Sequence, residues 1–319
     1  MKILKALKPG LFTTVQDLGR FGYLRYGVPI SGAMDTFSHT IANLLVDNSP
    51  AHACLEMTLI GAELQALTET QIALAGGEIS AKINDVDAPM WQTLNISEGD
   101  IISFGRMRNG CRVYLAVRGG VDVPLVLGSR STYVRGGFGG IEGRQLKAED
   151  TVDGFRARSV TKRFSMLKEQ IPQFADQVRV HVILGPQDDM FTEKGVETFL
   201  SNQYEITLEA DRMGYRLEGP VIEHKGKADI VSDALLPGAI QVPKSGKPIV
   251  IMRDAQTTGG YPKIAAVATS DVWRLGQAKP SITVSFEKIT MKEGYEKFLK
   301  YDKLLVSVRD AIAKNRTSF

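Results

Sequence analysis

The sequence has 319 residues, of which 43% are hydrophobic and 24% charged, with a formal net charge of +3. These values are typical of a globular protein long enough for two domains, and they exclude a disordered chain. No apolar run approaches the roughly 20 residues of a membrane helix, and no signal peptide is recognisable, so we expect a soluble, cytoplasmic protein without membrane contact.

The cysteines, histidines and basic residues argue against further classes of site and partner. Cys54 and Cys111 stand in apolar surroundings and are expected to be buried free thiols. The histidines are isolated from one another, which argues against a metal site. The densest basic stretch, residues 156–163, has no interleaved aromatic residues. It is therefore typical of a linker, and we expect no nucleic-acid partner.

The first half of the chain predicts one helix among several strands. Apolar positions at helical spacing predict an amphipathic helix over residues 34–47, with Asp35 near its start. Short apolar runs that end at glycine predict buried strands followed by exposed loops. Such runs lie at residues 71–75 before Gly76 and Gly77, and at 113–117 before Gly119 and Gly120. Residues 96–101 predict the end of one strand, a turn that needs glycine, and the beginning of another strand.

The second half repeats this pattern beyond a charged, glycine-poor stretch, residues 156–177, where we expect a domain boundary. Strands are expected at residues 178–183, 248–252 and 281–286, and a helix at 192–202. We divide the chain into residues 1–165, 166–289 and a C-terminal helical tail at 290–319. Strands and helices do not alternate regularly, so the predicted class is mainly β with a few helices, arranged as barrels or sandwiches.

Two polar clusters in the first half are candidate binding sites. One approaches the predicted helix start, where free backbone amides and the helix dipole favour an anion. Its candidate residues are Gln16, Asp17, Arg20, Ser31 and Asp35. The other, residues 128–144, places Arg130 and Ser131 among glycines that let a ligand approach the backbone. A capped helix and a flexible surface loop are the alternative interpretations.

Two further clusters lie in the second half. Gln187 follows the strand at 178–183, and Arg212 and Arg216 lie in an acidic and basic mixture that an ion-pair network would also explain. Residues 254–262 follow an apolar strand with a run of polar residues and glycines that packing does not explain. We expect this loop to face a ligand. Its candidate residues are Asp254, Gln256, Thr257, Thr258, Gly259, Gly260 and Tyr261.

Several catalytic motifs are missing from the sequence. It contains neither the glycine-rich P-loop of nucleotide-binding proteins nor the Gly-x-Ser-x-Gly elbow of serine hydrolases. Without an obvious nucleophile, metal or nucleotide loop, catalysis would depend on positioning and electrostatics. A site shared with another protein chain fits this situation.

Together these motifs resemble the allophanate-hydrolase-subunit-2-like family of biotin-dependent carboxyltransferase domains. The resemblance runs in order from about residue 3 to 290. It is carried by residues 14–20, 27–29, 31–35, Asn43, 115–120, 127–132, 185–187, 211–220, 232–233 and 254–262. The chain departs from the family pattern at residues 278–281, Ala-Lys-Pro-Ser, where a proline-glycine pair is common.

The resemblance implies two cyclophilin-like β-barrel domains and a role within an enzyme. The stand-alone branch of the family, the 5-oxoprolinase C subunits or KipA proteins, implies a hydrolase that works with the A and B subunits. This hydrolase opens 5-oxo-L-proline to L-glutamate with ATP, which would bind at a site shared with a partner. The catalytic candidates are then Asp17, Arg20, Asp35, Arg212, Asp254 and Gln256, and the other cluster residues would bind substrate.

Two alternatives stay open within the resemblance. One is a regulatory protein that binds and antagonises a histidine-kinase inhibitor, KipI. The other is a part of a carboxyltransferase. Because the chain has no biotinylated-lysine motif, biotin would then arrive on a partner.

Overall fold

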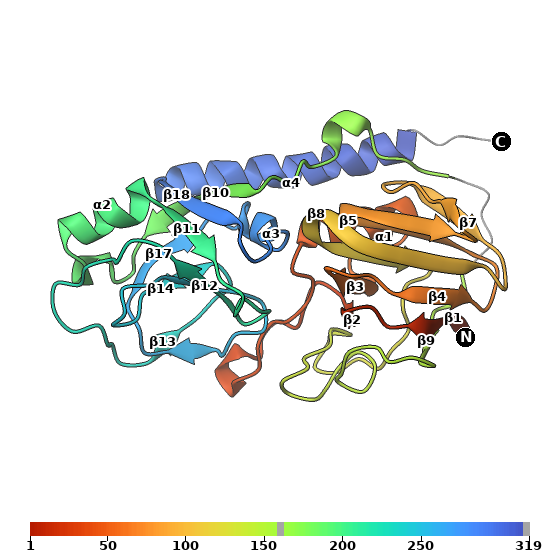
Figure 1. The fold of residues 1–319 in the computed structure, drawn as a ribbon, viewed down its shortest axis with the longest axis horizontal. Helices are drawn as coiled ribbons and strands as arrows, with labels where there is room; N and C mark the ends of the chain where they lie inside the picture. Colours follow the sequence, from red (N-terminus) through yellow and green to blue (C-terminus); the bar gives the residue numbers. More distant parts are fainter. Residues whose placement is uncertain (158–162, 315–319) are drawn as a thin grey trace. The chain divides into compact units, whose positions relative to one another are not determined.

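A computed structural model of the protein describes residues 1–157 and 163–314; five residues of the predicted basic linker, 158–162, lie outside the described residues. The chain forms two compact units (Figure 1). The first unit comprises residues 1–20, 31–174 and the chain from 304 onward, and the second comprises 21–30 and 175–303.

A nine-stranded antiparallel sheet that curls into a half-barrel forms the first unit. The main path is β2-β3-β8-β4-β1-β9, and β5 joins β8 to β6 and β7. The strands are β1 (Lys2–Lys8), β2 (Phe12–Gln16), β3 (Cys54–Thr58), β4 (Glu63–Ala66), β5 (Thr70–Ile83), β6 (Val86–Asp87), β7 (Thr93–Ile96), β8 (Ile101–Val117) and β9 (Thr151–Asp153). Alternate side chains such as Leu4, Leu55, Leu74 and Leu115 fill one continuous core.

Strands β5 and β8 are longer than the apolar runs that predicted them. The expected exposed loop after residue 75 is wrong, because β5 continues through Gly76 and Gly77 with shifts in its register against β8. A Cβ atom at Gly76 would lie 2.3 Å from the carbonyl oxygen of Arg112. Here glycine allows close approach of two strands. The turn at Gly119 and Gly120 does follow β8 as expected.

Helix α1 (Thr36–Leu45) confirms the predicted amphipathic helix and lies against β5 and β8 (Figure 1). Phe37, Ile41 and Leu45 recur at four-residue intervals and are fully or almost fully buried. Asp35 is the N-cap residue, and its side chain accepts a hydrogen bond from the Ser38 amide. The beginning of α1 therefore has a fixed position under the sheet.

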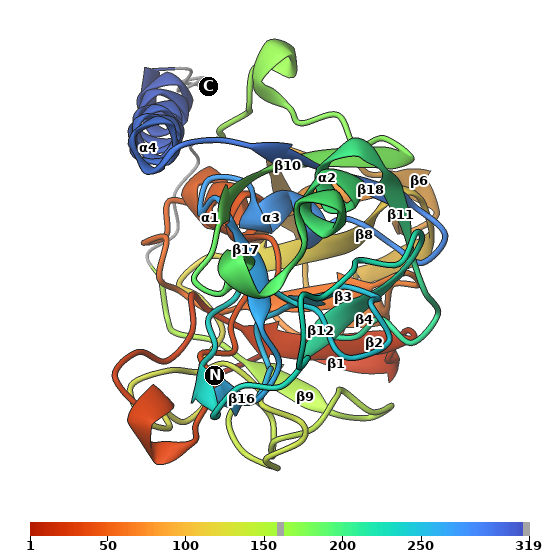
Figure 2. The same cartoon turned by 90° about the vertical axis from the view of Figure 1, so that its left-hand side faces the viewer.

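A closed barrel of seven strands forms the second unit, in the order β10-β17-β14-β15-β12-β11-β18. These strands are β10 (Gln177–Leu184), β11 (Gln203–Ile206), β12 (Gly214–Glu218), β14 (Ala239–Gln241), β15 (Ile249–Ile251), β17 (Lys263–Val267) and β18 (Thr283–Lys288). All neighbours are antiparallel except β10 and β18. Helix α2 (Glu193–Ser201) lies against β18 on one side of the barrel (Figure 2). There Phe199 stacks on Phe286 of β18 with ring centroids 4.5 Å apart.

A separate two-stranded ribbon pairs β13 (Asp233–Ala234) with β16 (Thr258–Gly259). The other elements are the 3-10 turns η1 (Leu24–Tyr26), η2 (Lys168–Gln170) and η3 (Asp188–Met190), the short helix α3 (Val272–Leu275) and the long helix α4 (Met291–Lys314). The mainly β class and the C-terminal helix are confirmed. Cys54 and Cys111 are buried free thiols, as expected. In the part of the chain that the structure describes, every helix is too short or too polar to cross a membrane.

Candidate functional site

The candidate residues divide between the two units. Gln16, Asp17, Arg20, Ser31, Asp35, Arg130 and Ser131 belong to the first unit. Gln187, Arg212, Arg216, Asp254, Gln256, Thr257, Thr258, Gly259, Gly260 and Tyr261 belong to the second. Each set is described separately below.

Asp17 joins two loops of the first unit. Its Oδ1 accepts hydrogen bonds from the Ser129 hydroxyl at 2.7 Å, the Ser131 hydroxyl at 2.5 Å and the Gly19 amide at 2.8 Å. Its Oδ2 accepts from the Arg130 amide at 2.6 Å. Four donors surround the carboxylate and fix its orientation. Asp17 therefore fixes the position of residues 129–131 next to the end of β2.

A network of buried acids holds the start of α1. Asp35 accepts from the Ser38 amide at 2.9 Å and from its hydroxyl at 2.5 Å, and its own amide donates to the Tyr114 hydroxyl at 2.8 Å. Tyr114 in turn donates to Glu56 Oε2 at 2.7 Å, which also accepts from the Met34 amide at 2.9 Å. Burial raises the pKa of Tyr114 well above its ordinary value, so the phenol stays a donor.

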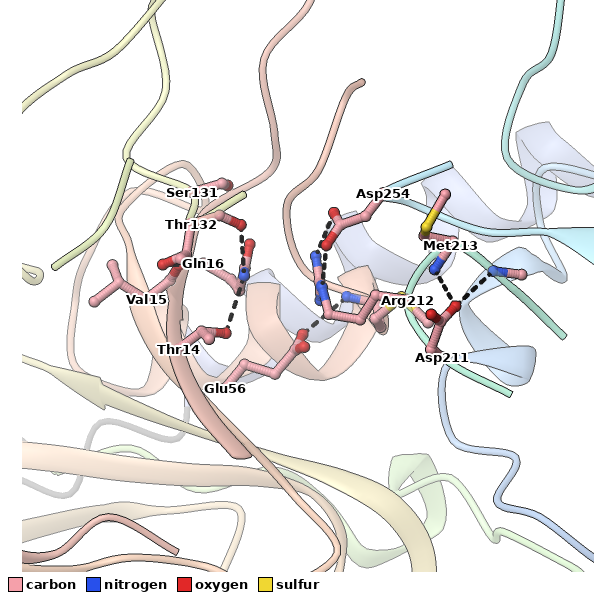
Figure 3. Close-up of polar contacts among 12 residues, drawn as sticks. Thr14, Val15, Gln16, Glu56, Ser131, Thr132, Asp211, Arg212, Met213 and Asp254 are labelled. Carbon is pink, nitrogen blue, oxygen red and sulfur yellow. Dashed lines mark hydrogen bonds and ion pairs between the residues drawn. The ribbon is translucent and has the colours of Figure 1, made fainter. Parts of the chain in front are cut away.

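Three side chains near this helix start carry polar atoms without a partner among the described residues. Gln16 donates from Nε2 to the Thr14 hydroxyl at 3.0 Å and to the Thr132 carbonyl at 3.2 Å, as Figure 3 shows, which leaves Oε1 unpaired. Ser31 Oγ and His39 Nδ1 are also unpaired. All three side chains are fully buried. Buried polar atoms normally have a partner, so these atoms point to a ligand or a bound water.

The protonation state of His39 follows from its surroundings. Burial lowers the pKa of His39 to about 4, so the imidazole is neutral at pH 7. Its Nε2 lies 3.2 Å from the carbonyl oxygen of Gln16 and therefore carries the proton. The His52 carbonyl also acts as a hydrogen-bond acceptor toward this ring, which leaves Gln16 Oε1 as the acceptor that suits a ligand N–H or O–H group.

The two candidate arginines of the first unit, Arg20 and Arg130, stack on aromatic rings. Arg20 is almost fully buried, donates to the Ser131 carbonyl at 2.5 Å and lies 5.0 Å from the centre of the Phe138 ring. Arg130 lies 4.9 Å from the centre of the Phe155 ring, while its backbone amide serves Asp17. Both guanidinium groups are held in place by cation–π contact.

In the second unit, Arg212 and Asp254 form a buried two-point ion pair. Arg212 Nε lies 2.7 Å from Asp254 Oδ2, and its terminal nitrogen lies 3.0 Å from Oδ1 (Figure 3). The Asp254 amide also donates to the Arg212 carbonyl at 2.8 Å. This planar pairing fixes both groups. It attaches the beginning of loop 254–262 to the segment that enters β12.

Residues around Arg212 have local roles. Asp211 Oδ1 accepts from the amides of Met213 at 2.7 Å and Gly214 at 3.2 Å, which shapes the turn (Figure 3). Arg216 is exposed on β12 and pairs with the exposed Glu209 at 3.1 Å. The expected mixture of charges thus contains one buried pair and one exposed pair, and exposed pairs contribute little stability.

The rest of loop 254–262 forms one strand of the β13–β16 ribbon and its flanks. Asp233 pairs with Gly259 and Ala234 with Thr258, and the Leu235 amide donates to the Thr257 carbonyl at 2.9 Å. The side chains of Gln256, Thr258 and Tyr261 are exposed, whereas Thr257, Gly259 and Gly260 are partly buried. The ribbon therefore presents polar side chains to solvent, consistent with the expected ligand-facing loop.

Gln187 lies at the foot of this ribbon. Two hydrogen bonds of 3.1 Å join it to the backbone of Lys263. Its side-chain Oε1 accepts from the Lys263 backbone N–H, and its own backbone N–H donates to the Lys263 carbonyl. Lys263 Nζ lies 2.5 Å from Asp233 Oδ2. The Lys263 ammonium holds the pKa of the Asp233 carboxyl below its usual value.

Sequence reasoning missed several of these residues. Glu56 interrupts the apolar run of β3, and a charged residue at an inward strand position was the available signal. Lys263 is the first residue of β17, and nothing in its sequence context distinguishes it from an exposed lysine at the end of a strand. His181 was treated as an isolated histidine, but its Nδ1 lies 2.6 Å from Asp271 Oδ2, which also accepts from the His181 amide at 2.9 Å.

The described residues contain no group of three or more histidine, cysteine, aspartate and glutamate side chains placed to hold a metal ion. The chemistry available is hydrogen bonding from fixed polar groups. In the first unit these are buried acceptors near a helix start; in the second they are cationic and amide donors below a polar ribbon. Such groups can orient a small polar molecule and stabilise charge on it.

Comparison with known proteins identifies relatives over nearly the whole chain. The family model for the carboxyltransferase domain, subdomain A and B, matches residues 26–288. The C subunit of 5-oxoprolinase from Escherichia coli is 36% identical, covering 91% of this chain and 93% of that protein. Its counterpart from Haemophilus influenzae, which bears the same name, is 34% identical, covering 88% and 89%.

A solved structure shares the fold. The crystal structure of the Kluyveromyces lactis urea amidolyase superimposes with a TM-score of 0.91 at 32% sequence identity. The match covers 97% of this chain but 20% of that one, so the chain corresponds to about a fifth of the larger protein.

Proposed function

The chain belongs to the family of carboxyltransferase domains with subdomains A and B, and on this premise we propose that it is the C subunit of an ATP-dependent 5-oxoprolinase. One observation carries the proposal: the match to the 5-oxoprolinase C subunit extends over nine-tenths of both chains. The match covers almost all of that C subunit. The urea amidolyase match relates the chain to one part of a larger protein.

The proposed reaction is the opening of 5-oxo-L-proline to L-glutamate, driven by ATP in a cytoplasmic complex with the A and B subunits. The substrate is a cyclic amide with one ring N–H. In the first unit, Gln16 Oε1 and the Ser31 hydroxyl offer partners to an N–H or O–H group of a bound reactant. Because the chain has no P-loop sequence, we place ATP at a site shared with a partner protein.

In this proposal the charged residues of each unit hold the loops of that unit in place, and none acts as a covalent nucleophile. Asp17 and the Arg212–Asp254 pair are fully engaged in hydrogen bonds within their own units, which suits a positioning role. Polar groups held in advance of the reaction lower its barrier, because they need not reorganise when charge develops.

The test is reconstitution. The chain is combined with purified A and B subunits of a 5-oxoprolinase, and glutamate and ADP formation from 5-oxoproline and ATP are measured with each of the three proteins left out in turn. We expect turnover only in the complete mixture. No glutamate in any combination would contradict the proposal.

A matched pair of variants connects the activity to the site. Gln16→Met removes the unpaired acceptor and should lower activity. Gln71→Met replaces another buried glutamine of the same sheet, which is hydrogen-bonded to Asn95 at 3.0 Å, and should preserve activity. Equal losses in the two variants would mean that Gln16 has no particular role.

A second candidate function is carboxyl transfer. It is favoured by the TM-score of 0.91 with the urea amidolyase structure. The chain has no biotin-attachment motif, so biotin would have to arrive on a partner. Incorporation of labelled bicarbonate into an amide, dependent on an added biotin carrier protein, would identify this activity.

A further inference from the structure

Lys263 is a lysine whose charged end is buried at the foot of an exposed ribbon. Only 5% of its side chain is accessible, and its Nζ lies 2.5 Å from Asp233 Oδ2 and 3.2 Å from the Ala234 carbonyl oxygen. A buried ammonium requires a counter-charge, because burial without one is costly. The counter-charge here comes from Asp233, whose own side chain is 50% exposed.

Gln187 supplies a second donor to the same oxygen. Its Nε2 lies 3.5 Å from Asp233 Oδ2. The orientation of its amide is fixed, because Oε1 accepts the Lys263 backbone N–H at 3.1 Å. Thus a charged donor and a neutral donor from the barrel converge on one carboxylate oxygen. This is the arrangement by which proteins bind a carboxylate group.

The donors and the acceptor differ in how firmly they are attached. Lys263 begins β17 and pairs with Gln241 of β14, and the Gln187 amide donates to the Lys263 carbonyl, so both donors belong to the barrel. Asp233 lies on a two-residue strand that pairs only with β16. A ligand could therefore replace Asp233 without disturbing the two donors.

The flanks of β13 support this difference. Val231 is 93% exposed and Leu236 is 56% exposed, while Leu235 lies in a small apolar cluster with Ala239, Ile251 and Ala255. Few contacts would break if Asp233 turned away from Lys263. Short, exposed segments of this kind open at low free-energy cost.

We propose that Lys263 and Gln187 form a binding site for a ligand carboxylate, which Asp233 occupies as an internal competitor when no ligand is bound. A carboxylate replaces Asp233 one for one, so the charge facing Lys263 is unchanged. A phosphate group would bring more negative charge to the same single lysine. The identification of the ligand as 5-oxoproline, which carries one carboxylate, rests on the proposed function.

The experiment compares ligands and variants on the full chain. Binding of 5-oxoproline, of 2-pyrrolidinone, which lacks the carboxylate, and of inorganic phosphate is followed by NMR titration. Removing the competitor in Asp233→Asn should tighten 5-oxoproline binding several-fold. Lys263→Met should weaken it about tenfold or more, the effect of losing one charge-assisted hydrogen bond. Lys263→Arg, which keeps the charge, should bind with intermediate affinity, and 2-pyrrolidinone should bind equally to all variants.

Asp229→Asn is the matched control. Asp229 is an exposed aspartate on the same approach to the ribbon, and its replacement should leave all affinities unchanged. If Asp233 merely fastens the ribbon, Asp233→Asn will lower the melting temperature without tightening 5-oxoproline binding, and the proposal is overturned. Stronger displacement of Asp233 by phosphate than by 5-oxoproline would also overturn it.

Turnover in the reconstituted complex separates this inference from the proposed function. If glutamate is formed but the KM for 5-oxoproline is unchanged in Lys263→Met and Lys263→Arg, the carboxylate site is wrong while the function stands. If no glutamate is formed but 5-oxoproline binding still depends on Lys263 and its carboxylate, the site stands and the function is wrong.

Discussion

Replacing Asp254 by asparagine removes the charge that faces the buried Arg212 guanidinium while nearly preserving the shape of the side chain. Both side chains are only 8% exposed, and two hydrogen bonds of 2.7 and 3.0 Å join them. Removing one member of such a pair leaves a buried charge uncompensated, which costs about 3–5 kcal/mol of folding free energy. For the second unit this corresponds to a fall of about 10–17 °C in melting temperature.

The assay is a double-mutant cycle on the free energy of unfolding by urea. It compares the wild-type chain with Asp254→Asn, Arg212→Met and the double variant. The cycle isolates the interaction between the two side chains from the other contacts of Arg212. We expect the double variant to be more stable than the sum of the single losses predicts, with a coupling of about 2–3 kcal/mol. Arg212→Lys keeps the charge but loses the planar fork, so it should cost about 1–2 kcal/mol.

A coupling below about 0.5 kcal/mol would refute this reasoning, because distant and independent sites show values of that size. An equal cost for Arg212→Lys and Arg212→Met would refute it as well, since the charge would then make no contribution. Hydrogen exchange in loop 254–262 provides a second measure. Its amides should exchange faster in Asp254→Asn, because the pair attaches the beginning of the loop.

Two other predictions follow from buried groups. The pKa of His39 is about 4 in the folded chain and near 6.5 when unfolded, so the unfolded state takes up a proton as pH falls through this window and stability falls by up to about 3 kcal/mol. His39→Gln, which keeps an N–H donor, should flatten the difference in denaturation midpoint between pH 7 and pH 4.5; an unchanged slope would exclude His39 as its source. A Cβ at Gly259 would lie 2.7 Å from Gln241 Nε2 and 2.9 Å from a Leu235 methyl carbon, whereas at Gly260 the nearest atom is 3.4 Å away. Gly259→Ala should therefore cost about 1–3 kcal/mol in thermal unfolding and Gly260→Ala less than about 0.5 kcal/mol, and equal costs would contradict the close contact.

Local features of the fold could be predicted because their causes are local. The apolar spacing of α1 and its cap at Asp35 lie within a dozen residues, as do the runs that became β10 and β18. The continuation of β5 through Gly76 could not be predicted. There the choice between a turn and a strand depends on the neighbouring strand β8, more than 30 residues away in the chain.

The candidate sites show the same division. The sequence placed Asp17 and Ser131 in separate clusters, and their hydrogen bond spans 114 positions, which no spacing rule connects. The pairing of Lys263 with Asp233 depends in the same way on how the ribbon lies at the barrel foot. Residue types identified the loops as functional candidates. Only the fold shows which side chains meet within each unit.

The parallel pairing of β10 with β18 has a consequence for the order of events during synthesis. β10 begins at Gln177, and its partner β18 is not complete until Lys288, so the ring of strands cannot close while the intervening chain is still being made. Until then, the backbone N–H and C=O groups of β10 and β11 that pair with β18 are free to pair with strands of other chains. Contacts so distant along the chain also form slowly. We therefore expect the incomplete barrel to be the aggregation-prone intermediate during synthesis, and a chaperone that binds it to increase the yield of folded protein.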